Sequence, residues 1–228
     1  MKNKKYFLSE PIIGKKEILY VNKSLKNNWL SSIGPEVKRF KKKLGKKLGT
    51  KNISLVNSGT SSIHLALISL NVKPNDIILT QSFTFVGSVN PIRYCNCKPV
   101  FIDSEKETLN IDPEKLEKAI KFYLKRNIKP KAIIVVHIYG IPCKIKKIIS
   151  ISKKYNIPVI EDAAEAFGSK VENKFCGTFG DIGILSFNAN KILTCGGGGA
   201  IISKNRNIIK QSDYLSSQAK ENTLYYLH

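Results

Sequence analysis

Short apolar runs alternate with segments of helical periodicity over most of this 228-residue chain, and this order constrains the fold most strongly. The apolar runs are rich in Val, Ile, Leu or Phe and cover residues 53–56, 77–80, 99–103, 132–137, 158–162, 183–187 and 200–203. Helical patterns at 61–70, 113–124 and 145–155 lie between several of them. Because parallel neighbours need crossover connections, we predict an α/β fold with a mostly parallel seven-stranded sheet between helices.

The chain shows no internal repeat, low-complexity tract or Pro/Gly-rich linker, so it is predicted to fold as one unit. Residues 1–34 are expected to form an N-terminal segment that packs on a large domain at 35–228. Ligands of open α/β sheets bind at the carboxyl ends of the strands. Polar residues that follow the predicted strands are therefore the first candidates for a functional site.

The formal net charge of +21 raises the alternative of a nucleic-acid-binding protein. The excess of positive charge comes almost entirely from lysine. Arginine, which binds phosphates and guanine edges more specifically, occurs only four times. The densest basic stretch, residues 36–48, places Val37, Phe40, Leu44 and Leu48 on one helical face. This pattern predicts a core-facing helix with solvated lysines, with a membrane-surface or partner helix as the alternative.

The start of the chain, residues 1–8, is basic but lacks the apolar run and cleavage site of a signal peptide, and no later stretch is apolar enough to span a bilayer. The five cysteines are scattered and odd in number, without a C-x-x-C pair. They predict neither a disulfide framework nor a metal site. We therefore expect a cytoplasmic protein with reduced thiols that binds no membrane.

Asn57-Ser58-Gly59-Thr60-Ser61-Ser62 lies between a predicted strand and a predicted helix. Glycine permits a tight turn, hydroxyl groups donate hydrogen bonds, and the start of a helix presents free N–H groups with the positive end of its dipole. The segment is a candidate phosphate cradle. The alternative is an ordinary N-cap, since serine and threonine are common capping residues.

Two acidic residues, Glu161 and Asp162, end the apolar strand at 158–162. A buried carboxylate without a partner costs several kcal/mol, so Asp162 needs a cation or backbone donors. A protonated pyridine nitrogen would satisfy it, and so would helix capping. Glu165 follows Asp162 at helical spacing, and by itself it indicates a solvent-exposed residue.

Lys191 comes shortly after the apolar run at 183–187 and before four glycines, Gly196 to Gly199. A lysine in a pocket of low dielectric has a depressed pKa, which makes its neutral amine available as a nucleophile for Schiff-base chemistry. The alternative is a surface lysine, as most lysines of this chain must be. The glycines precede a strand, so they indicate close packing or a turn and not a nucleotide P-loop.

Three motifs follow one another in the chain: Ser-Gly-Thr at 58–60, Glu-Asp-Ala-Ala-Glu at 161–165 and Ser-Phe-Asn-Ala-Asn-Lys at 186–191. In this order the sequence resembles the DegT/DnrJ/EryC1/StrS family of sugar aminotransferases. This family has the fold type I of enzymes that depend on pyridoxal 5'-phosphate (PLP). Further matching segments lie at 9–14, 29–34, 83–85, 99–103 and 136–140, so the resemblance covers nearly the whole chain.

The resemblance implies roles for single residues. Lys191 would bind the cofactor covalently and shuttle a proton between the substrate carbon and the cofactor. Asp162 would keep the pyridine nitrogen protonated, and Phe85 would stack on the ring. Glu165 would lie near the ring hydroxyl, a position that is often Gln or His in relatives.

The phosphate of PLP would be bound, by the same resemblance, by Thr60, by the backbone around Gly59 and Ser61, and by Ser186. These assignments would supply a cation to the buried carboxylate and an anion to the start of the helix.

Two features depart from the family pattern. Gly196 to Gly199 lacks the acid that often occurs there, which resembles the branch that aminates 4-keto sugars toward bacillosamine or legionaminic acid. Family members also continue past the position of His228 into a G-Y-N-Y-R segment and a small C-terminal domain. We therefore expect a large domain that is truncated at its C-terminal end, with the small domain absent.

The resemblance predicts a transaminase that moves an amino group from an amino acid, glutamate in this family, to a nucleotide-linked keto-sugar, and a homodimer when full length. One alternative is a truncated, non-catalytic PLP-binding remnant or regulatory protein. The related sugar dehydratases replace the lysine with histidine, so Lys191 argues against that branch. Nucleic-acid binding by the basic surface is the third alternative, and no nucleic-acid partner is expected.

Overall fold

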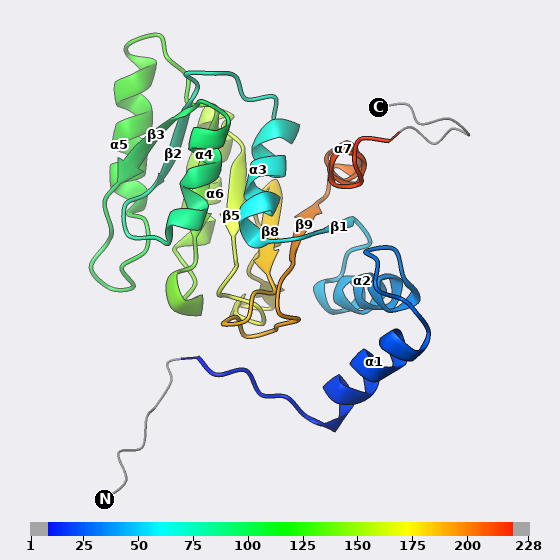
Figure 1. The fold of residues 1–228 in the computed structure, drawn as a ribbon. Coiled ribbons are helices and arrows are strands. Elements are labelled where there is room, and N and C mark those ends of the chain that lie inside the picture. The colour runs from blue at the N-terminus through cyan, green and yellow to red at the C-terminus, as the bar shows by residue number, and fades with distance from the viewer. Residues whose placement is uncertain (1–8, 221–228) are drawn as a thin grey trace, which may run out of the picture.

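The computed structural model describes residues 9–220 and contains one main sheet of seven strands (Figure 1). The basic start at 1–8 and the last residues, 221–228, lie outside the described residues. The strands are β1 (Ile53–Val56), β2 (Ile77–Gln81), β3 (Lys98–Ile102), β4 (Ala132–Val136), β5 (Val159–Asp162), β8 (Ile182–Ser186) and β9 (Gly199–Ser203). All seven predicted strands are confirmed, with ends that differ by one residue or less.

The strand order is β1-β9-β8-β5-β4-β2-β3, and the five strands from β8 to β3 run parallel. β9 runs antiparallel to both of its neighbours, β1 and β8. The predicted mostly parallel α/β sheet is therefore confirmed. A short hairpin of β6 (Lys170–Val171) and β7 (Lys174–Phe175) lies in the connection between β5 and β8.

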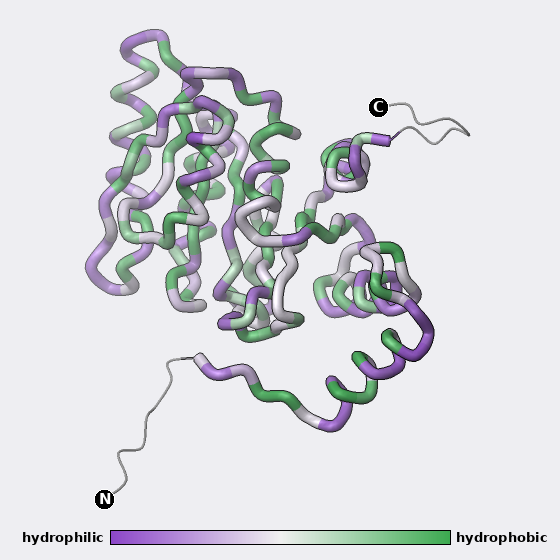
Figure 2. The backbone as a smooth tube through the Cα atoms, in the orientation of Figure 1, coloured by the Kyte–Doolittle hydropathy of each residue, from purple (hydrophilic) through white to green (hydrophobic). Residues whose placement is uncertain are grey.

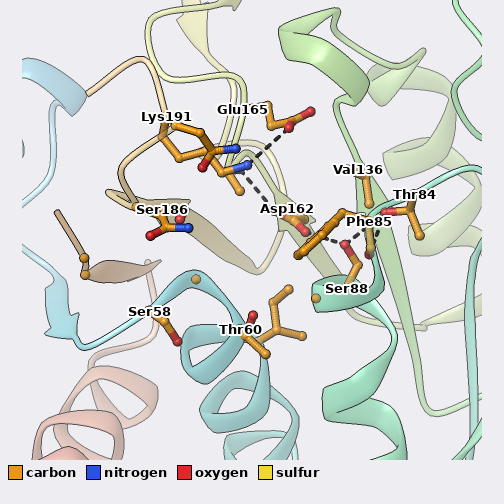
Figure 3. A pocket seen from close by; sticks show the side chains of 18 of the residues that line it. Ser58, Thr60, Thr84, Phe85, Ser88, Val136, Asp162, Glu165, Ser186 and Lys191 are labelled. Atoms are coloured by element: carbon orange, nitrogen blue, oxygen red, sulfur yellow. Dashed lines mark hydrogen bonds and ion pairs between the residues drawn. The ribbon is translucent and has the colours of Figure 1, made fainter. Parts of the chain in front are cut away.

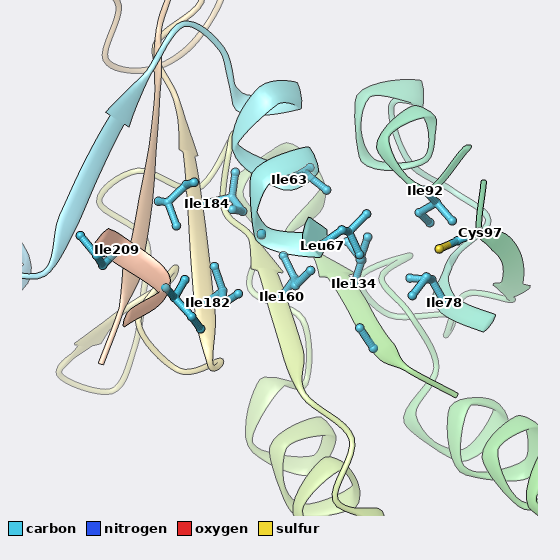
Figure 4. Close-up of a cluster of buried hydrophobic side chains, with 14 residues drawn as sticks. Ile63, Leu67, Ile78, Ile92, Cys97, Ile134, Ile160, Ile182, Ile184 and Ile209 are labelled. Atoms are coloured by element: carbon cyan, nitrogen blue, oxygen red, sulfur yellow. The ribbon is translucent and has the colours of Figure 1, made fainter. Parts of the chain in front are cut away.

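One face of the sheet is covered by α3 (Gly59–Ser69), α4 (Asn90–Tyr94) and α7 (Arg206–Ser216). Ile63 and Leu67 of α3 pack against Ile160 and Ile184 of the central strands (Figure 4). Burying such side chains contributes about 1.5–3 kcal/mol each. This cluster anchors the N-terminal turn of α3 beside the carboxyl ends of β5 and β8.

The opposite face is covered by α2 (Pro35–Leu48), α5 (Pro113–Leu124) and α6 (Ile145–Tyr155). The predicted core-facing stripe of α2 is confirmed: Leu44 is buried with Ile53 and Leu185, and Phe40 meets the ring of Phe187 edge-on at 5.1 Å. Along α2 the tube in Figure 2 alternates between hydrophilic and hydrophobic residues, as an amphipathic helix requires.

An additional helix, α1 (Lys15–Lys26), precedes α2 and lies beside it, away from the sheet (Figure 1). It contains no buried residue, and Ile18, Leu19, Val21 and Leu25 are exposed. Its Tyr20 ring stacks under the guanidinium of Arg39 at 4.4 Å. The division into a segment at 1–34 and a domain at 35–228 stays a prediction. Within residues 9–220 no helix has both the length and the apolar character needed to cross a bilayer.

Candidate active site

A cavity of about 260 Å³ lies where the carboxyl ends of β5 and β8 meet the start of α3 (Figure 3). Seven of the eight predicted site residues line it: Gly59, Thr60, Phe85, Asp162, Glu165, Ser186 and Lys191. These residues come from distant parts of the sequence, and the sheet brings them together at the edge where α/β folds bind ligands.

Ser61 is the predicted residue that the structure leaves outside this lining. Its N–H donates to the Ser58 hydroxyl at 3.0 Å, and the two hydroxyls lie 2.9 Å apart. Ser58 is thus the N-cap of α3. For Ser58 and Ser61, the alternative of ordinary helix capping is therefore correct. Thr60, one position earlier, faces the cavity.

Two glycines keep the start of α3 close to its neighbours. A Cβ at Gly59 would lie 2.9 Å from the Cβ of Ser186, so the turn can touch the end of β8 because residue 59 has no side chain. A Cβ at Gly87 would lie 3.0 Å from both the Phe85 ring and the Thr60 hydroxyl. The hydroxyls of Thr60 and Ser186 therefore converge at a helix N-terminus, which suits an anionic group.

Asp162 ends β5 at the floor of the cavity and is 4% exposed. Oδ2 accepts a hydrogen bond from the Ser88 hydroxyl at 2.7 Å, and Oδ1 accepts one from the Ala164 N–H at 3.0 Å. Burial raises the pKa of Asp162, while these two donors and the charge of Lys191 lower it. Within residues 9–220 the carboxyl makes no ion pair, so a cation in the cavity would complete its environment.

The raised pKa of Asp162 predicts the effect of Asp162→Asn on the cofactor-free protein. A carboxyl whose pKa is higher in the folded than in the unfolded chain opposes folding once the pH exceeds the unfolded value of about 3.9. The substitution should therefore raise Tm at pH 7 and have no such effect near pH 3. Thermal unfolding across this range, with the exposed Glu114→Gln as the control, measures it; a lower Tm at pH 7 would contradict the prediction.

Lys191 lies in the loop between β8 and β9, and its side chain is 13% exposed. Its Nζ donates to Glu165 Oε1 at 3.1 Å, and the other oxygen of Glu165 accepts the N–H of Tyr139 at 3.0 Å. Tyr139 has a φ of +51°, an uncommon conformation for a side chain of this size. Glu165 is thus not a freely solvated residue: it joins the lysine amine to the turn after β4.

Phe85 lines the same cavity from the segment that follows β2. The residue is 73% exposed, so its ring can stack on a planar ligand. Together with Asp162 and Lys191, Phe85 gives the lining an aromatic face, a carboxylate and an amine (Figure 3).

A buried network beneath Asp162 was not predicted from the sequence. The side chain of Glu161 accepts the N–H groups of Gly177 at 2.6 Å, Phe179 at 2.7 Å and Gly180 at 2.9 Å. It also lies 2.9 Å from Nε2 of His137. Because Nδ1 of His137 accepts the Cys143 N–H at 3.0 Å, Nε2 carries the hydrogen and donates it to Glu161.

His137, Glu161 and Cys176 are the group within residues 9–220 whose ligand atoms lie close enough to hold a metal ion. The hydrogen bonds of His137 and Glu161 already use both ring nitrogens and both carboxylate oxygens. The arrangement therefore works as a hydrogen-bonded brace between β4, β5 and the segment that leads into β8.

Sequence reasoning also missed Ser88 and Thr84, which line the cavity. Both follow the carboxyl end of β2, and the rule that ligands bind at strand ends, applied to every strand, would have found them.

A model of the DegT/DnrJ/EryC1/StrS aminotransferase family matches residues 11–227. The chain belongs to this family. It is 43% identical to EpsN of Bacillus subtilis (strain 168) over 99% of this chain and 58% of EpsN. It is 36% identical to the GDP-perosamine synthase of Escherichia coli O157:H7 over 96% of this chain and 58% of that protein. The chain thus spans little more than half the length of these relatives.

The fold is shared with Spr1654 of Streptococcus pneumoniae, whose structure was solved in a PLP form. The TM-score is 0.86 at 27% identity, and the match covers 97% of this chain and 60% of Spr1654. The lining described above fits PLP: a buried carboxylate that lacks a cation, two hydroxyls at a helix N-terminus, an exposed aromatic ring and a reachable lysine amine. Family membership and this fit support PLP as the cofactor.

Proposed function

We propose that this chain is the cofactor-binding part of a PLP-dependent aminotransferase that transfers an amino group from glutamate to a nucleotide-linked keto-sugar. The observation that carries the proposal is the meeting of Lys191, Asp162, Thr60 and Phe85 in one cavity. The name of the GDP-perosamine synthase supports a nucleotide-sugar acceptor. The choice of glutamate, and of a 4-keto sugar as acceptor, rests on the family resemblance.

In this proposal each side chain has a task that its position allows. Lys191 would bind the cofactor and carry a proton, and Glu165, 3.1 Å from its amine, would hold that amine in place. Asp162 would keep a ring nitrogen protonated, and Phe85 would cover the ring. Thr60, Gly59 and Ser186 would hold the phosphate, with Ser61 acting through the helix start that it helps to cap.

PLP, when bound, supplies an electron-withdrawing ring that stabilises negative charge on the substrate carbon. The protein adds a proton carrier, a fixed carboxylate and an aromatic ring that can cover the cofactor. A homodimer and a cytoplasmic location stay predictions, and the five free cysteines are compatible with a reducing compartment.

The decisive experiment is reconstitution of the protein with PLP, reduction with borohydride and peptide mapping. Modification at Lys191 is expected, and modification elsewhere or none at all would overturn the proposal. Addition of glutamate without an acceptor should then convert bound PLP to pyridoxamine phosphate. A protein that is labelled at Lys191 but does not convert the cofactor would instead match the alternative of a non-catalytic PLP-binding protein.

A further inference from the structure

Asp162 is held by a hydroxyl from a different part of the fold. Ser88 lies in the short helical turn η1 (Val86–Ser88) after β2 and is 3% exposed, and its Oγ donates to Asp162 Oδ2 at 2.7 Å (Figure 3). The two residues are 74 positions apart in the sequence, so this bond ties the η1 turn to the end of β5.

The direction of the hydrogen bonds around Ser88 follows from counting hydrogens. A serine hydroxyl has one hydrogen, and the carboxylate of Asp162 can only accept. The Ser88 hydrogen is therefore committed to Asp162. The Thr84 hydroxyl lies 3.0 Å from Ser88 Oγ and 3.4 Å from the Phe85 carbonyl oxygen, and since the Ser88 hydrogen is committed, Thr84 donates in the shorter of these two contacts. The result is a directed chain from Thr84 to Ser88 to Asp162.

This chain fixes the orientation of the carboxyl group. Ser88 holds Oδ2, and the Ala164 N–H holds Oδ1 at 3.0 Å. These donors come from two different elements, so the carboxyl cannot rotate about its terminal bond without losing at least one of them. The remaining lone pairs of Asp162 are thereby directed at a fixed angle toward the cavity that both Asp162 and Ser88 line.

We propose that Ser88, supported by Thr84, is a positioning residue that orients Asp162 toward a positively charged ring nitrogen and favours its carboxylate form. This inference rests on the proposed function, because the ring nitrogen belongs to PLP.

Among the groups around Asp162, Ser88 contributes most to keeping the carboxyl ionised. Burial raises the pKa of Asp162, and the Ser88 hydroxyl is the strongest influence that lowers it, followed by the Ala164 N–H and the charge of Lys191. Lys191 faces the cavity from the loop after β8, Glu165 from the segment after β5, and His137 lies at the end of β4. Glu165 is paired with Lys191 and offsets part of that positive charge.

The test compares Ser88→Ala, Ser88→Thr and Thr84→Val with Ser82→Ala, an exposed serine of the same segment. Two quantities are measured: the pKa of Asp162 in the cofactor-free chain by carboxyl NMR, and the affinity for PLP by absorbance titration. Ser88→Ala should raise the pKa and weaken PLP binding by about tenfold or more, the range of a hydrogen bond to a charged group. Ser88→Thr should retain both values, Thr84→Val should change both less than Ser88→Ala, and Ser82→Ala should change neither.

An unchanged pKa of Asp162 in Ser88→Ala would overturn the inference, even if the variant were less stable. A raised pKa with unchanged PLP affinity would overturn it as well, because the carboxylate would then not need Ser88 to bind the cofactor. Failure of the proposed function gives a different result. The unsubstituted protein would then bind no PLP at Lys191, and the inference would fall with it, although the NMR measurement would still detect the hydrogen bond.

Discussion

Lys191→Ala should abolish covalent capture of PLP and reduce amino transfer on the order of 10⁴-fold, because the substitution removes both the nucleophile and the proton carrier. Lys191→Arg should fail as well: it retains a cation beside Glu165, 3.1 Å from the native amine, but an arginine stays protonated and cannot act as a nucleophile. Borohydride reduction followed by peptide mapping, together with a transamination assay, measures both effects.

The matched control is Lys118→Ala, which removes an exposed lysine of α5 far from the cavity in sequence and structure. It should leave capture and turnover unchanged. If Lys191→Ala still bound PLP covalently to the same extent as the unsubstituted protein, another of the many lysines would hold the cofactor. The assignment of Lys191 would then be wrong.

Glu161→Ala should destabilise the fold by about 4 kcal/mol, because it leaves buried donors without acceptors. Three backbone N–H groups and the His137 ring donate to this side chain, and each buried donor left unsatisfied costs about 1–3 kcal/mol. Some of this loss is recovered if water enters the space. Glu161→Gln retains the shape and one acceptor oxygen, so its effect should be smaller.

Urea unfolding of the cofactor-free protein measures this prediction as a lower midpoint at an unchanged m-value. The exposed Glu114→Ala on α5 is the control and should change stability by no more than about 0.5 kcal/mol. A Glu161→Ala protein as stable as this control would mean that the brace contributes little to folding.

Most of the sheet could be predicted because buried strands differ from helices in their apolar patterns. β2, β4 and β8 are buried along their whole length and appear in the sequence as largely apolar runs. The direction of β9 could not be predicted in the same way. A buried strand has the same apolar pattern whether it runs parallel or antiparallel, and β9 is antiparallel to both neighbours.

Only those residues of the candidate site that lie in short sequence motifs could be predicted from the sequence. Lys191 and Asp162 were assigned by the order of motifs, since each alone had an ordinary structural explanation. Glu161 and His137 were not assigned, because their roles depend on partners that are distant in the sequence. No periodicity or local spacing reports that a glutamate accepts three N–H groups from a loop that comes 16 to 19 positions later.

The antiparallel placement of β9 between β8 and β1 has a consequence for the order in which the protein matures. β1 is an early strand of the chain, yet its partner in the sheet is β9, and Ser58 forms a bridge with Gly198. The turn with Thr60 therefore reaches its final neighbours only after residue 199 has been synthesised and placed. Such long-range pairing is slow to form. A growing chain would thus complete its sheet before it can retain a cofactor, so that cofactor loading belongs to the last stage of folding.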